Sequence, residues 1–71
     1  MSQLRKNILT NREKEVLTLL ISNKSTREIS EELHISEKTV RNHISNVIQK
    51  LSVKGRACAV IELVKLGELE I

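Results

Sequence analysis

The sequence predicts an all-α fold, a four-helix bundle that contains a helix-turn-helix. Apolar residues recur at helical spacing in four segments, and no segment shows the alternation typical of a strand. Proline is absent and both glycines come late, so nothing interrupts these segments. A chain of 71 residues is one domain, near the lower size limit for a single core. We expect a flexible arm at residues 1–9 and a folded domain at residues 10–71.

The first helix should begin after Thr10. Thr10 and Glu13 have the spacing of a capping box, in which each side chain bonds the other residue's backbone amide. Asn23 tolerates the left-handed conformation and should end the helix. Before it, Ile8 and Leu9 should pack onto the core, while the basic residues that precede them fray. The predicted buried stripe is Val16, Leu17, Leu20 and Ile21.

The next two helices form the predicted helix-turn-helix. A second capping box, from Ser25 to Glu28, starts a short helix that ends at Leu33. His34 occupies the turn, and histidine is among the residues more tolerant of a positive φ. Ser36 is a good N-cap for a long amphipathic helix over residues 36–51. Two helices joined by a turn of this length are typical of the motif.

The helix at residues 36–51 has one apolar face and one polar face. The apolar residues are Val40, Ile44, Val47 and Leu51. The polar residues are Lys38, Arg41, Asn42, Ser45, Asn46 and Gln49, and we expect no carboxylate along this face. Arginine and asparagine match the major-groove edges of guanine and adenine, and a helix fits that groove. The pattern therefore predicts a DNA recognition helix.

The alternative is an ordinary solvated helix face, and the distribution of charge argues against it. Residues 38–61 contain five Lys or Arg and no acidic residue, while six of the nine Glu lie at or before Glu37. The net charge of +3 is modest and common among proteins that never contact nucleic acid. The clustering of basic charge near the predicted recognition helix is the informative feature.

The fourth helix should run from Arg56 to Leu66 and be ended by Gly67. One stripe, predicted to face the core, is Ala59, Val60, Leu63 and Leu66. A second stripe is Ala57, Ile61 and Val64. A terminal helix in so small a bundle can bury only one of them, so the second is a candidate partner surface. We expect a homodimer through this helix and, by its two-fold symmetry, an inverted-repeat operator.

Several function classes are disfavoured by composition. The single cysteine, Cys58, excludes an intramolecular disulfide, and with two distant histidines it matches no zinc pattern. The chain lacks aromatic residues on which single-stranded bases stack, and we expect no cofactor or small-molecule ligand. It also lacks Asp, a nucleophile beside a base and a Gly-rich phosphate loop, so an enzyme is not expected. No membrane span or secretion leader is visible, which favours a cytoplasmic protein.

Three sequence runs resemble the LuxR-type helix-turn-helix family: LTNREKEVL at residues 9–17, STREISEELHIS at 25–36 and KTVRNHISNVIQKL at 38–51. Arg56 and Ala59 add to the match, which covers nearly the whole chain. The resemblance implies a winged-less helix-turn-helix domain that binds specific double-stranded DNA and activates or represses transcription. Departures are small, with Ser30 where the family usually has Ala, and Asn23 with Lys24 where Gly is frequent.

Within the family the chain is most similar to a stand-alone regulator of late sporulation. This implies spore-coat gene regulation in the mother-cell compartment and contact with RNA polymerase holoenzyme. Larger family members place this domain after a phosphoacceptor or signal-binding domain, whereas here only nine residues precede the first helix, so no built-in switch is expected. The alternatives are a helical protein-interaction module that binds the transcription machinery, or an output domain cut from a larger response regulator.

The family pattern and the helical geometry together predict the DNA-contacting residues. The predicted base contacts are Arg41, Asn42 and Ser45, with Lys38 close to the groove. The predicted phosphate contacts are Thr26, Thr39, His43, Asn46, Lys50 and Lys54. For His43, a half-buried packing role is an equally good interpretation.

Overall fold

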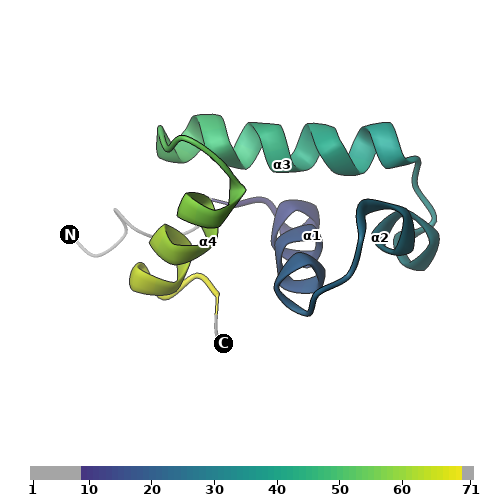
Figure 1. The fold of residues 1–71 in the computed structure, drawn as a ribbon, viewed down its shortest axis with the longest axis horizontal. Coiled ribbons are helices and arrows are strands. Elements are labelled where there is room, and N and C mark those ends of the chain that lie inside the picture. Colours follow the sequence, from purple (N-terminus) through teal and green to yellow (C-terminus); the bar gives the residue numbers. More distant parts are fainter. Residues whose placement is uncertain (1–8, 70–71) are drawn as a thin grey trace.

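The computed structural model describes residues 9–69, and this part of the chain contains four α-helices and no strand (Figure 1). The helices are α1 (Asn11–Ile21), α2 (Thr26–Leu33), α3 (Glu37–Leu51) and α4 (Arg56–Lys65). α3 lies along one side of the molecule and packs against each of the other three, which lie beneath it in Figure 1. The all-α prediction is confirmed. The predicted arm lies, up to residue 8, outside the described residues.

Local hydrogen bonds fix where α1 and α2 begin. The Thr10 hydroxyl accepts from the Glu13 amide at 3.1 Å, and the Thr10 amide donates to the Glu13 carboxylate at 3.0 Å. Ser25 and Glu28 make the same reciprocal pair at 3.1 and 2.8 Å. The bond from the Ser25 amide is the main reason why the pKa of Glu28 is lowered. Both predicted capping boxes are therefore present.

Left-handed residues follow the helices. Asn23 has φ 70°, His34 has φ 60°, Ser52 has φ 55° and Gly67 has φ 79°. In this conformation two backbone amides turn back onto the last carbonyls of the helix, as the Val53 amide does onto the Ile48 oxygen at 3.3 Å. The roles predicted for Asn23 and His34 are confirmed. The left-handed Ser52 was not predicted.

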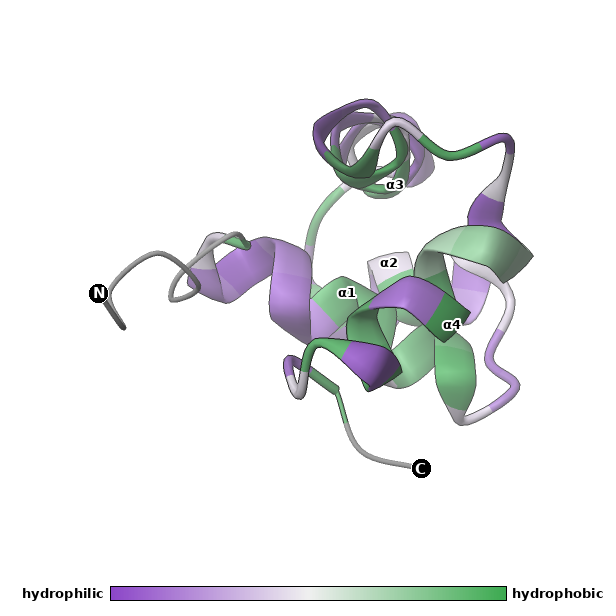
Figure 2. Ribbon diagram, turned by 90° about the vertical axis from the view of Figure 1, so that its left-hand side faces the viewer, coloured by the Kyte–Doolittle hydropathy of each residue, from purple (hydrophilic) through white to green (hydrophobic). Residues whose placement is uncertain are grey.

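The core is formed by one apolar stripe from each helix. Figure 2 shows α3 nearly end-on, with its hydrophobic side toward the other helices and its hydrophilic side outward. Leu9 is buried, as expected, and Ser30 of α2 is buried as well. The Ser30 hydroxyl donates to the Arg27 carbonyl at 2.7 Å, so burial leaves it satisfied. The buried apolar residues are Leu9, Val16, Leu17, Ile29, Val40, Ile44, Val47, Ala59, Leu63 and Leu69.

The prediction for the last turn of the fourth helix was partly wrong. Ala59 and Leu63 are buried, but Leu66 is 40% exposed because the helix ends at Lys65 and the chain turns at Gly67. The amide of Glu68 bonds the Leu63 carbonyl at 2.9 Å, and the next residue, Leu69, takes the place in the core. None of the four helices between residues 9 and 69 is long and apolar enough to cross a membrane.

Candidate nucleic-acid interface

The outer face of α3 is a continuous polar surface. α3 buries only its apolar stripe, which packs on the three helices beneath it (Figures 1 and 2). Its opposite side chains are all exposed, and they include the four predicted base contacts. We call this surface the reading face; it consists of Lys38, Arg41, Asn42, Ser45, Asn46 and Gln49. One straight helix thus presents hydrogen-bonding side chains along a single line.

The edge of the reading face toward α2 carries a carboxylate. Glu37 Oε1 accepts from Arg41 Nη2 at 3.1 Å and from the Thr26 hydroxyl at 3.5 Å. The side chains of Arg41 and Glu37 are 59% and 40% exposed, so the pair is open to solvent. An exposed i,i+4 pair contributes only about 0.3–0.5 kcal/mol. The expectation of an acid-free surface was therefore wrong at this edge, because Glu37 lies one helical turn before Arg41.

The edge of α3 toward α1 holds a partly buried ion pair. Lys50 Nζ lies 2.6 Å from Glu13 Oε1, and the side chains are 37% and 5% exposed respectively. Burial raises the pKa of the Glu13 carboxyl, but the bonds from Lys50 and the Thr10 amide, with the charges of Lys50 and His43, outweigh it and lower the pKa. Lys50 was predicted to contact phosphate. In this structure its ammonium group bonds the Glu13 carboxylate in the first turn of α1.

Of the other predicted phosphate contacts, Asn46 belongs to the reading face and the remaining four lie outside it. Asn46 and Lys54 are exposed, and Thr26 and His43 are partly buried. Thr39 is also partly buried, and its hydroxyl lies 2.9 Å from the Ser36 hydroxyl within the cap of α3. The half-buried position of His43 fits both of its interpretations.

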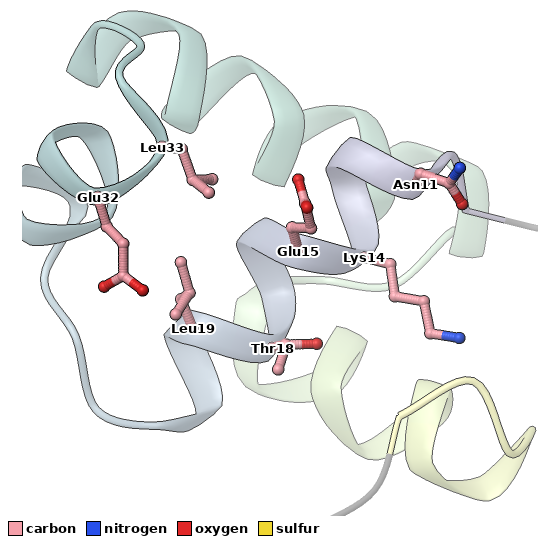
Figure 3. Close-up of a pocket in the computed structure, with 7 residues that line it drawn as sticks. All are labelled: Asn11, Lys14, Glu15, Thr18, Leu19, Glu32 and Leu33. Atoms are coloured by element: carbon pink, nitrogen blue, oxygen red, sulfur yellow. The ribbon is translucent and has the colours of Figure 1, made fainter.

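A concave feature lies between α1 and the end of α2. It is an open groove of about 580 Å³. Leu19 and Leu33 approach each other within it, whereas the charged ends of Lys14, Glu15 and Glu32 point in different directions (Figure 3). Catalysis requires polar groups that converge on a reacting atom. The groove therefore carries no arrangement that suggests an enzyme.

Known proteins are similar to this chain in sequence and in fold. The family described as "Bacterial regulatory proteins, luxR family" matches residues 7–63. The chain is 64% identical over 66 residues to the spore germination protein GerE of Bacillus subtilis strain 168, covering 93% of this chain and 89% of GerE. It is 51% identical over 65 residues to the transcriptional regulatory protein DegU of Brevibacillus brevis, covering 92% of this chain but 28% of DegU.

A solved structure agrees with the fold as well as with the sequence. The structure titled as transcription factor GerE superimposes with a TM-score of 0.89 at 58% identity, covering 92% of this chain and 97% of that one. Because the family match covers well over half of the chain, family membership is shown directly by sequence. The chain belongs to the luxR family of bacterial regulatory proteins and is a helix-turn-helix, DNA-binding transcription regulator rather than an enzyme.

Proposed function

We propose that the protein binds an inverted-repeat operator in duplex DNA as a homodimer, with α3 of each protomer in a major groove. The observation that carries the proposal is the reading face of α3, which is exposed, lacks an internal carboxylate and presents Arg41 beside Asn42, with Asn46 one turn after Asn42. Such side chains read guanine and adenine by paired hydrogen bonds. A protein-interaction helix has no need of this composition, which disfavours that alternative.

The residues around α3 divide by role. The base contacts are Lys38, Arg41, Asn42 and Ser45. The phosphate contacts are Thr26, Thr39, His43, Asn46, Lys50 and Lys54. The ammonium group of Lys50 has three donors, so it can contact phosphate while it keeps its bond to Glu13. Thr26 is the first residue of α2, where free backbone amides favour a phosphate oxygen. Phosphate contacts fix the register of the helix on the duplex, whereas base contacts select the sequence.

Dimerisation through α4 would place two reading faces on the same side of a duplex. Ile61 is 56% exposed and Ala57 is exposed beside it, while Val64 at the end of the stripe is half-buried against the core. Because both protomers present the same patch, a two-fold contact covers both copies. It would bring the recognition helices to successive major grooves about 34 Å apart, which requires an inverted repeat. The patch is small, so DNA should strengthen the dimer.

The regulator would activate some promoters and repress others, with direct contact to RNA polymerase at activated ones. The identity to a protein named for spore germination supports a role in a spore-forming bacterium, and the resemblance to a late-sporulation regulator implies the mother-cell cytoplasm. The partial match to DegU supports a second arrangement, in which the same domain is the output of a larger regulator. The DNA surface would be the same in both.

Selection from random duplex DNA tests the proposal. Purified protein should enrich one inverted repeat, and its affinity for that repeat should fall steeply with salt, by about 0.9 in log K per decade for each phosphate neutralised. A flat salt response would count against phosphate contact. Enrichment of no sequence, combined with retention of a polymerase subunit, would favour the protein-interaction alternative instead.

A further inference from the structure

Glu37 is the only acidic residue of α3, and it touches two groups assigned to DNA. Its Oε1 atom accepts from the Arg41 guanidinium at 3.1 Å and from the Thr26 hydroxyl at 3.5 Å. Arg41 lies on the reading face and Thr26 begins α2. The carboxylate therefore joins a base contact to a phosphate contact at the edge of the surface that meets DNA.

Stabilisation of the helix start explains only part of this arrangement. A negative side chain in the first turn interacts favourably with the helix dipole, and Glu37 is the first residue of α3. That role would be fulfilled with the carboxylate directed at solvent. It does not account for a bond to the side chain that reads a base.

A carboxylate at this place acts differently on correct and incorrect DNA. It repels phosphate oxygens in every complex, which weakens all binding by a similar factor. On the correct site Arg41 gives two of its five N–H donors to one guanine, and the remaining donors can keep the bond to Glu37. The bond then holds the guanidinium plane in one orientation, whereas on an incorrect site nothing offsets the repulsion.

We propose that Glu37 is a specificity-determining residue, which positions the Arg41 guanidinium for its base and lowers affinity for DNA that lacks this base. The proposal rests on the proposed function, because it assumes that α3 reads duplex DNA. The exposure of the pair fits this role, because the Arg41 side chain is 59% exposed and its other donors can reach a base while the bond to Glu37 is kept.

The test compares Glu37→Gln with wild type on two duplexes, the repeat selected from random DNA and a scrambled version of it. Glutamine keeps the size and one acceptor oxygen but removes the charge. Affinity for the scrambled duplex should rise about fivefold at low salt, the factor for removing one unit repulsion near 4 Å in water. Affinity for the selected repeat should rise less, so the ratio of the two affinities falls. Repeated selection should show relaxed preference at one base pair of each half-site.

Glu15→Gln is the matched control. Glu15 also pairs with an arginine, Arg12 at 3.2 Å, and it is exposed on α1 beside the groove of Figure 3. The control makes the same change of net charge away from the reading face, so the affinity ratio should stay at the wild-type value. In an Arg41→Ala background, Glu37→Gln should no longer alter the base preference, because the side chain that it positions is gone.

Three results would overturn the inference. Equal gains on both duplexes would mean that Glu37 contributes only bulk charge. A lower melting temperature with an unchanged affinity ratio would mean that it only stabilises the start of α3. If wild-type protein itself shows no sequence preference on duplex DNA, the proposed function fails, and the role of Glu37 fails with it.

Discussion

The buried pair between Glu13 and Lys50 predicts that Lys50→Met destabilises the fold in a pH-dependent way. The Glu13 carboxylate is almost fully buried and bonds both Lys50 and the Thr10 amide. Methionine has the helix propensity of lysine and a similar apolar stem, so the substitution removes mainly the ammonium group. The carboxylate would keep the Thr10 bond but lose its counter-charge.

The expected size of the effect follows from the geometry. A hydrogen bond to a charged group contributes about 1.5–3 kcal/mol, and the 2.6 Å contact between Lys50 and Glu13 is of this kind. Because the Lys50 side chain is 37% exposed, water screens part of the interaction, and the lower half of the range applies. We expect the free energy of unfolding to fall by about 2 kcal/mol at pH 7. Domains have only about 0.05–0.15 kcal/mol of stability per residue, so this is a large share.

The sign of the pH dependence can be worked out for Glu13. In the wild type the folded pKa lies below the ordinary value of 4.5. A lowered acid pKa stabilises the fold above the unfolded value, and this stabilisation is lost as pH falls through the folded pKa. In Lys50→Met the bond and charge that lower the pKa of Glu13 are lost, while burial still raises it. The pKa of Glu13 therefore rises relative to wild type. The difference in stability between the two proteins should therefore shrink as pH falls below 4.5.

Urea denaturation measures this prediction. Far-UV circular dichroism is the suitable signal because the chain contains no Trp or Tyr. Lys14→Met, at an exposed position of α1, is the control and should change stability by less than about 0.5 kcal/mol at every pH. A loss in Lys50→Met no larger than the control, or one that stays constant from pH 7 to acid, would refute the account of the buried pair.

Three further predictions concern base recognition, backbone strain and dimerisation. Arg41→Ala should cost about 1–3 kcal/mol on the selected repeat and relax preference at one base pair in titrations; a uniform loss on all duplexes would reassign Arg41 to the backbone. Ser52→Gly should raise the free energy of unfolding by about 0.5–1 kcal/mol, because φ 55° strains serine but not glycine; no gain in urea titrations would contradict this. Ile61→Glu should keep its helical circular dichroism and half-site binding but lose affinity for the full repeat; unchanged full-repeat affinity would remove α4 from the dimer contact.

Local signals in the sequence were sufficient for most of the fold. The capping boxes at Thr10 and Ser25 and the left-handed turn at His34 each depend on residues only a few positions apart. Their chemistry is independent of the rest of the molecule, so the helix limits could be predicted. The buried stripe of α3 followed from periodicity in the same way.

The contacts that the sequence did not predict depend on packing between distant segments. Lys50 and Glu13 are 37 positions apart, and the pattern around Lys50 showed only a basic residue on a helix flank. Leu69 reaches the core only because the chain turns back after α4, which leaves Leu66 exposed. The pair between Glu37 and Arg41 was also missed, although it is local and its i,i+4 spacing was a signal that helical geometry could have used.

Under the proposed function, the length of α3 limits how many base pairs one protomer can read. The reading face runs from Lys38 to Gln49, which at 1.5 Å per residue is about 16 Å, or roughly five base-pair steps. Any given five-base-pair sequence occurs by chance about once in a thousand positions, while a genome offers about a million or more competing sites. Two such half-sites at a fixed spacing occur together by chance only about once in a million positions. For a domain with a single short reading helix, the proposed dimer would therefore be what makes a binding site unique in a genome.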